Sequence, residues 1–222
     1  MAYFQSTYLT KVYREFKAID PTAYRQLIRY YEKRSEIIGQ LEFEEFFEVL
    51  VIYVEALFEV GAYHKHIVAV DTVIEYSITY NIHFHKGKDI YYDMLFKKAA
   101  SHFNLVQYEK AEHILKELIK INPNEEDVIV FLKKCLRRKN GRLVRIAKAS
   151  SILLFLITAM VISIEVLLVR PFYRAYAPNI ESFRTSLFII GILILILGDL
   201  IHRVQVEVNV KKYVSSCTEK SL

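Results

Sequence analysis

The chain has 222 residues, is 53% hydrophobic and carries a formal net charge of +5. The charge is uneven: residues 1–132 hold 15 Lys+Arg against 20 Asp+Glu, whereas residues 133–148 hold eight Lys+Arg and no acid. A nucleic-acid-binding domain carries basic residues over a folded face, so the acidic first part argues against a nucleic-acid partner. The two cysteines, Cys135 and Cys217, form no disulfide framework.

The first predicted elements are helices. Asp20-Pro21 predicts a helix start, with Asp20 as the N-cap and Pro21 at the first helical position, where no N–H is needed. Gly39 ends this helix. Residues 42–60 are strongly apolar, but their glutamates would each cost free energy in lipid. This segment therefore predicts a helix buried inside a helical stack.

Further helices are predicted at 63–80, 90–105, 108–121 and 125–138. A loop is predicted at 81–89, because Asn81 and Gly87 interrupt the helical pattern. Strand signals are almost absent from this part of the chain.

Histidines gather around this loop, at His64, His66, His83 and His85. A His-x-His pair binds metal when other ligands join it, but no complete ligand set is present. Surface histidines are the alternative, and we expect no metal or cofactor. No glycine-rich phosphate loop or nucleophile elbow is found either, so we expect no enzyme.

Residues 94–124 place small and aromatic side chains at fixed intervals. The defining residues are Ala99, Phe103, Tyr108, Ala111 and Pro123. The alanines let two antiparallel helices approach closely, the aromatic pair flanks their turn, and the proline closes the unit. This pattern resembles a tetratricopeptide repeat. Val106 departs from it where the family prefers glycine, and Leu118 where a small residue is usual.

A weaker unit occupies 45–80. Gly61 and Tyr63 supply its turn, but His66 replaces the small residue at the helix crossing. Gly61 and Val106 lie 45 residues apart. The usual repeat is about 34 residues, which indicates an insertion of about eleven. A third unit at 5–38 rests on helix periodicity alone. The resemblance implies an all-α repeat domain over 1–138.

The same resemblance implies a protein-binding groove lined by the first helix of each pair. Its positions here are Glu48, Val51, Glu55, Glu59, Asp93, Phe96, Ala100 and Asn104. The three glutamates share a helix face, which predicts a basic or amphipathic helical protein partner. A solvated helix face is the alternative, and the sequence leaves both open.

Two apolar runs follow the basic collar, which we define as residues 133–148. The first, 149–169, contains one charge, Glu165, and the second, 185–202, contains Asp199 before His202. A bilayer core about 30 Å thick needs roughly 20 apolar helical residues, with about 17 as a lower limit. The runs predict two transmembrane helices.

The predicted boundaries around them are a juxtamembrane segment at 139–148, which is the second part of the collar, a short loop at 170–184 and a tail at 203–222. In the tail, valines alternate with polar residues from Val204 to Val210. The sequence leaves two interpretations of this segment, a strand or a continuation of the second apolar helix.

The collar favours cytoplasmic termini, because positive charge marks that side of a membrane. A bacterial inner membrane is our expectation, and the collar could also hold anionic lipid headgroups. Glu165 and Asp199 are candidate membrane acids, with placement at the membrane surface as the alternative. Gly191 and Gly198 share a helix face that would admit another helix.

Together these patterns predict a cytoplasm-facing adaptor or scaffold without catalytic activity, anchored by a two-helix hairpin. The alternative is an accessory subunit of a transport or envelope-assembly complex, in which the hairpin makes the main contacts. The sequence leaves the partner and any homo-oligomer open.

Overall fold

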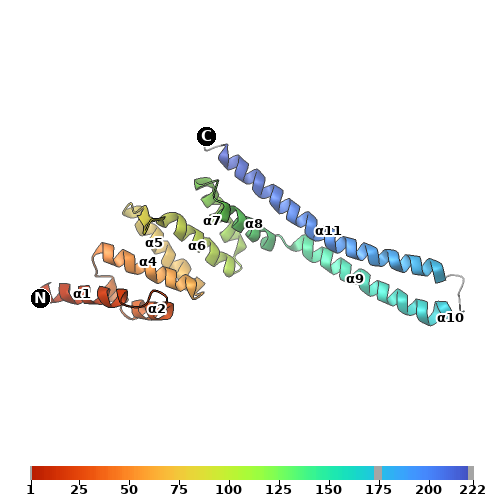
Figure 1. The fold of residues 1–222 in the computed structure, drawn as a ribbon, viewed down its shortest axis with the longest axis horizontal. Helices are drawn as coiled ribbons and strands as arrows, with labels where there is room; N and C mark the ends of the chain where they lie inside the picture. Colours follow the sequence, from red (N-terminus) through yellow and green to blue (C-terminus); the bar gives the residue numbers. More distant parts are fainter. Residues whose placement is uncertain (1, 173–176, 220–222) are drawn as a thin grey trace. The chain divides into compact units, whose positions relative to one another are not determined.

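The structure, a computed structural model, describes residues 2–172 and 177–219 and is built almost entirely of α-helices (Figure 1). The predicted all-α class is therefore confirmed. Contacts divide the chain into two compact units, Met1–Val128 and Ile129–Leu222. Each unit is described by itself.

The first unit is a series of short helices. They are α1 (Ala2–Lys17), α2 (Tyr24–Lys33), α3 (Ser35–Ile38), α4 (Phe43–Glu59), α5 (Tyr63–Thr79), α6 (Ile90–Asn104) and α7 (Tyr108–Ile121). From α4 to α7, each helix packs against the next one in the chain. The helices predicted at 42–60, 63–80, 90–105 and 108–121 are confirmed to within about a residue at each end.

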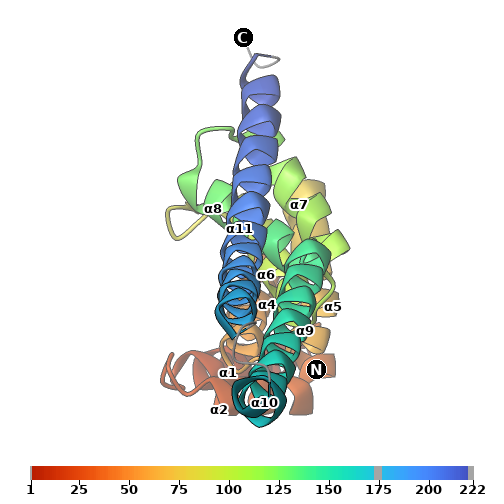
Figure 2. The same cartoon turned by 90° about the vertical axis from the view of Figure 1, so that its right-hand side faces the viewer.

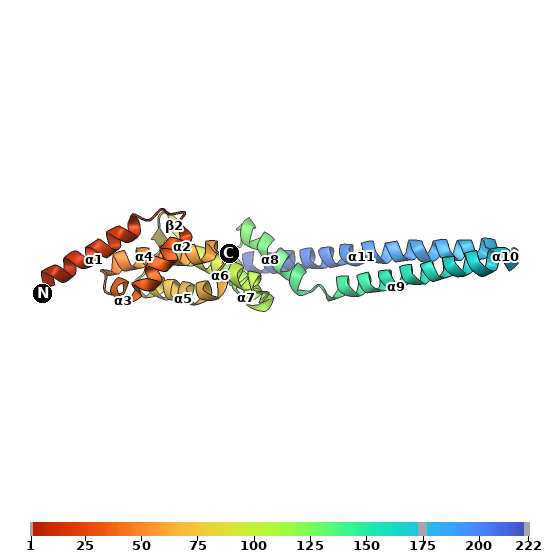
Figure 3. The ribbon, with the colours of Figure 1, turned by 90° about the horizontal axis from the view of Figure 1, so that it is seen from below.

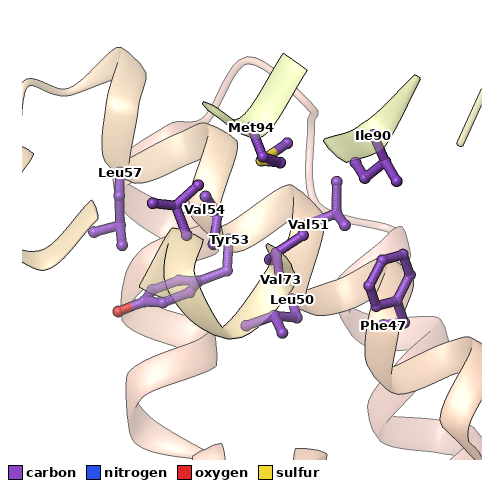
Figure 4. Close-up of a cluster of buried hydrophobic side chains, with 10 residues drawn as sticks. Phe47, Leu50, Val51, Tyr53, Val54, Leu57, Val73, Ile90 and Met94 are labelled. Carbon is purple, nitrogen blue, oxygen red and sulfur yellow. The ribbon is translucent and has the colours of Figure 1, made fainter. Parts of the chain in front are cut away.

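The core of this unit is centred on α4. Val54 and Leu57 are fully buried there, beside Val73 of α5 and Met94 of α6 (Figure 4). Each buried aliphatic side chain contributes roughly 1.5–3 kcal/mol. The apolar residues of α4 are thus covered by protein, and the prediction of a buried helix at 42–60 is confirmed.

Three helices of this unit end in the same left-handed turn. The backbone φ is +76° at Gly61, +55° at Asn81 and +62° at Val106. The next residue donates its N–H to the carbonyl five residues back: Ala62 to Leu57, Ile82 to Ser77 and Gln107 to His102, at 2.8–2.9 Å. This is the Schellman arrangement. A positive φ strains a β-branched residue. Val106 therefore holds a strained backbone conformation that glycine would adopt more easily.

The predicted helix from Asp20 to Gly39 is wrong at its start and in its middle. The Asp20 carboxylate accepts bonds from the N–H and hydroxyl of Thr22, at 2.8 and 2.7 Å. This local Asx turn holds the chain outside the helix. Helix α2 begins at Tyr24, and a break at Arg34 separates it from α3.

The predicted loop at 81–89 contains a small hairpin. Strand β1 (Phe84–His85) pairs antiparallel with β2 (Lys88–Asp89). Lys86 and Gly87 connect them with φ of +49° and +78°. Two positive φ values in a two-residue connection suit a type I′ turn, which matches strand twist. Asp89 then caps α6 by accepting the N–H of Tyr92 at 2.9 Å.

The second unit is a long helical hairpin. The first residues of helix α8 (Glu126–Lys139) belong to the first unit, and the rest of the helix belongs to the second unit. Helix α9 (Arg142–Ile164) runs through a π-helical segment, η1 (Glu165–Val169), into α10 (Arg170–Phe172), and α11 (Ala177–Thr218) returns beside it. Figure 3 shows α9 and α11 side by side, and Figure 2 shows them as neighbours nearly end-on.

Both long helices are apolar enough to cross a membrane. Their apolar windows have mean hydropathies of 2.8 and 2.3, and 17% and 11% of the window residues are buried. A core helix of a soluble protein would be mostly covered, whereas these helices present isoleucine and leucine side chains outward. The two predicted apolar helices are thus present and exposed.

Their boundaries differ from the predicted ones. The loop expected at 170–184 is wrong, because helix extends to Phe172 and resumes at Ala177; residues 173–176 lie outside the described part. Helix α11 has 42 residues. At 1.5 Å per residue it is about 63 Å long, roughly twice a bilayer core.

The segment from Val204 to Val210, for which the sequence was compatible with a strand or a helix, is helical. His202, Val206 and Val210 are buried at four-residue spacing, whereas Val204 and Val208 are exposed. Positions two apart lie on nearly opposite sides of a helix, since each residue turns it by about 100°. The alternating valines therefore lie on two opposite faces of the helix, one buried and one exposed.

Candidate functional site

The predicted groove residues of α4 and α6 form an ion-pair network. Glu48 accepts hydrogen bonds from Tyr13 at 2.5 Å and Lys17 at 2.6 Å, and lies 3.9 Å from Lys86. Burial would raise the pKa of Glu48, but the bonds from Lys17 and Tyr13 and the charges of Lys17 and Lys86 lower it overall. This carboxylate is therefore ionised and neutralised within the chain.

One lysine joins the two repeat helices. Lys97 of α6 contacts Glu55 of α4 at 2.9 Å and Asp93 of α6 at 2.8 Å. Burial would lower the pKa of Lys97, but its bonds to both carboxylates raise it overall. Glu55 and Asp93 thus share one cation.

The other groove positions differ in exposure. Val51 is 1% exposed and belongs to the core, so its predicted place in an open groove is wrong. It belongs to the same cluster of buried side chains as Ile90 and Met94 of α6. Glu59 and Asn104 are exposed at the ends of their helices, and Phe96 and Ala100 are half-buried.

A cavity of about 160 Å³ adjoins this face, between α1, α2 and α4. Phe16, Ile52 and Ala56 line it, and Lys17 and Glu55 stand at its charged part. Lys17 and Lys86 were missed by sequence reasoning, because nothing in their spacing indicates that they reach α4. The face is a nearly neutral surface with an apolar hollow.

The residues that define the predicted repeat occupy matching places in two helical pairs. Phe58 and Tyr63 flank the Gly61 turn with ring centroids 6.0 Å apart, and Phe103 and Tyr108 pair at 5.4 Å. At the same offset of 45 residues, these pairs of positions have 0% exposure: Val54 and Ala99, His66 and Ala111, Val70 and Leu115, Val73 and Leu118. One packing plan is used twice.

His66 lies at the helix crossing of the weaker pair, where the repeat pattern has a small residue, and it forms a hydrogen bond there. Its Nδ1 lies 2.8 Å from the Ser101 hydroxyl of α6, and its ring lies 5.3 Å from Phe58. Burial, together with the nearby Lys97 charge, lowers the pKa of His66 to about 4. A neutral imidazole is therefore a core residue here.

The other histidines are dispersed. His102 lies 2.7 Å from Gln107 in the second turn, and His85 packs against Phe47. Within the described ranges, no group of three or more His, Cys, Asp or Glu side chains is arranged to hold a metal ion.

In the second unit, Glu165 is the centre of a buried ion cluster. It is 1% exposed and accepts bonds from Arg170, at 3.0 Å, and from Arg184 of α11, at 2.8 Å. The carboxylate therefore ties the two helices together where they approach the hairpin turn. The sequence indicated a membrane acid but missed Arg184, 19 residues away, because its register depends on the hairpin.

Asp199 lies far from this cluster along α11 and pairs with Arg203 at 2.8 Å. The glycines of α11 face α9: a Cβ on Gly198 would lie 2.4 Å from the Ala147 Cβ, and one on Gly191 would lie 2.8 Å from the Phe155 ring. The Ser151 hydroxyl also donates to the Gly191 carbonyl at 2.9 Å. The face predicted to admit another helix is thus used within the hairpin.

No protein-family model, curated protein or solved structure gives a significant match to the chain.

Proposed function

We propose that the chain is a membrane-anchored adaptor with a tetratricopeptide-like protein-binding domain and no catalysis of its own. The observation that carries the proposal is the packing plan repeated at an offset of 45 residues. Stacked helical pairs of this kind expose the first helix of each pair on one face. Here that face runs across α4 and α6, where Lys97 joins Glu55 to Asp93.

The spacing of basic residues from α9 to α10 and along α11 supports membrane anchoring. Lys148 and Arg170 are 22 residues apart, and Arg184 and Arg203 are 19 apart. At 1.5 Å per residue these are about 33 and 28 Å, close to the thickness of a bilayer core. The basic collar would then lie on the cytoplasmic side, which for a bacterium means the inner membrane.

The charges favour an amphipathic helix over a simply basic segment as the partner. Glu48, Glu55 and Asp93 already have lysine partners, so little unneutralised acid remains on the face. The hollow beside Glu55 can take an apolar side chain. An apolar anchor gives more binding energy than an exposed charge pair.

An accessory membrane subunit is the second candidate, and the exposed apolar side chains of α9 and α11 favour it. Against it, Gly191 and Gly198 contact α9 rather than offering a close-packing face to another protein.

Site-specific photocrosslinking in the full-length protein in cell membranes separates the two. A photoreactive residue at Ala100 or Asn104 should crosslink the adaptor's partner, whereas one at Leu156 or Leu193 should crosslink only lipid. Protein adducts from the hairpin positions and none from α6 would favour the accessory subunit.

A charge reversal tests the face itself. Glu59→Lys, at the exposed end of α4, should weaken the α6 crosslink several-fold. Glu75→Lys, equally exposed but on the second helix of its pair, is the matched control and should leave it unchanged. Membrane insertion is checked separately, by resistance of the full-length protein to alkaline extraction.

A further inference from the structure

A pocket of about 550 Å³ lies in the second unit, among the end of α8, the first turns of α9 and the middle of α11. Its basic lining residues are Lys134, Arg137, Arg138, Arg145, Lys148 and Arg203. Asp199 is the one acid in the lining and is paired with Arg203. Six cations against one carboxylate leave an excess of five positive charges around a concave space.

The walls of this pocket are held by other contacts. The His202 Nε2 donates to the Arg137 carbonyl at 3.2 Å, which joins α11 to α8. Lys133 and Glu207 pair at 2.6 Å one turn further on. The close approach of Gly198 to Ala147 brings α9 against the same stretch of α11. These contacts join α11 to α8 and α9 without using the side chains of Arg145 and Lys148.

Exposed apolar side chains follow the lining residues of the pocket along both long helices. On α9, Ile152 and Leu156 continue the row of Lys148 at four-residue spacing and are 58% and 64% exposed. On α11, Leu195 and Ile196 lie one turn beyond Asp199 and are 42% and 49% exposed. A cationic hollow thus continues into two apolar rows about one turn away.

We infer that this pocket binds the phosphate headgroup of an anionic membrane lipid, whose acyl chains lie along the exposed rows of α9 and α11. Arginine forks match phosphate oxygens with paired hydrogen bonds, and basic clusters beside a membrane helix attract anionic lipids. Free phosphate offers the same oxygens but no apolar chain, so the rows favour the lipid. The inference rests on the proposed membrane hairpin and specifies what its basic end recognises.

The test uses full-length protein purified in detergent and placed in nanodiscs of phosphatidylcholine with or without an anionic phospholipid. After release, native mass spectrometry counts the phospholipids that stay bound. We expect retained anionic lipid and little retained phosphatidylcholine. Arg145→Gln/Lys148→Gln should weaken retention about 25-fold, because each basic residue near an anionic surface contributes roughly fivefold.

The control variant Lys211→Gln/Lys212→Gln loses the same charge on α11 outside the pocket and should keep the lipid. An equal loss of bound anionic lipid in both variants would mean that overall charge determines retention, and it would overturn the proposal that the pocket binds the headgroup. Inorganic phosphate should compete only weakly; displacement of the lipid at equal concentration would assign the site to a soluble phosphate compound.

Failure of this inference is separable from failure of the adaptor. Loss of lipid selectivity with intact alkaline resistance and intact α6 crosslinking overturns the headgroup site alone. Extraction of the full-length protein at alkaline pH would overturn the anchor, and the lipid site with it.

Discussion

The two units use the same aliphatic residues in opposite ways. In α4, Val49, Val54 and Leu57 are fully buried, and glutamates along the helix meet lysines from neighbouring elements. In α9 and α11, most leucines and isoleucines are exposed, and the buried Glu165 of η1 is held by two arginines. The same side-chain types thus form the buried core of the first unit and the exposed surface of two helices that are long and apolar enough to cross a membrane.

The largest effect is expected from removing the buried acid of the hairpin. Glu165→Ala leaves Arg184 without its counter-ion across the helix pair. Breaking a buried ion pair from one side costs roughly 3–5 kcal/mol. We expect the lower end, since Arg170 is 58% exposed and can be solvated. Reversible unfolding of the full-length protein in mixed micelles measures the loss.

Glu181→Ala is the matched control. Its carboxylate lies 3.6 Å from the same Arg184 but is 59% exposed. Exposed pairs contribute about 0–1 kcal/mol, so this variant should be near neutral. Equal losses in the two variants would mean that burial of Glu165 does not matter.

The glycine contacts of the hairpin should give the next largest effect. Gly198→Ala places a Cβ 2.4 Å from the Ala147 Cβ, so the helices must separate. Overpacking of this kind costs about 1–3 kcal/mol. The exchange Gly198→Ala/Ala147→Gly should recover most of the loss in the same unfolding measurement. A double variant as unstable as the single one would contradict direct contact.

These variants also mark where sequence reasoning ends. The helices of the repeat pairs follow from local periodicity and turn residues, which is why α4 to α7 could be predicted. Lys17, Arg184 and Ala147 are partners of Glu48, Glu165 and Gly198. Each lies at least 19 residues from its partner, and the contacts depend on how helices are registered against each other. A carboxylate in an apolar run is visible in the sequence, but its counter-ion is not.

Local competition explains the remaining errors. At Asp20 the sequence offers both an N-cap and an Asx turn, and the turn forms because Thr22 supplies two donors. Residues 81–89 were predicted as a loop, because strands of two residues, such as Phe84–His85 and Lys88–Asp89, are too short to show a periodicity in the sequence. Val51 was placed by alignment with the repeat, whereas its own helix buries that position.

His66 should make the first unit sensitive to acid. Burial lowers the pKa of His66 to about 4, against 6.5 for a free histidine. Above pH 6.5 the ring is neutral in both the folded and the unfolded chain, so it does not make the free energy of unfolding depend on pH. As the pH falls from there toward 4, only the unfolded chain gains the proton, so stability decreases by up to about 1.4 kcal/mol per unit. Hydrogen exchange of α5 amides at pH 7.5 and 5.5 reports this loss.

His66→Ala should flatten this acid slope while lowering stability at neutral pH through the lost packing. His64→Ala, on the exposed side of the same helix, should keep the slope. An unchanged slope in His66→Ala would assign acid sensitivity to other groups.

The smallest effect is a gain, at the turn of the stronger pair. Val106 has a φ of +62° and is 67% exposed, so its side chain loses little burial when removed. A left-handed conformation costs a Cβ-bearing residue about 1–2 kcal/mol. Glycine loses about 0.5–1 kcal/mol more conformational entropy. Val106→Gly should therefore stabilise α6 and α7 by about 0.5–1 kcal/mol, measured by exchange of their amides.

The reverse change at the equivalent turn makes this a test of backbone strain. A Cβ on Gly61 would meet nothing closer than 3.8 Å, so the Cβ of Gly61→Val adds strain at a φ of +76° without itself clashing. It should destabilise α4 and α5 by about 1–2 kcal/mol. If Gly61→Val behaves so while Val106→Gly is also destabilising, the valine must stabilise its turn through contacts that outweigh the strain, and the two turns are not equivalent.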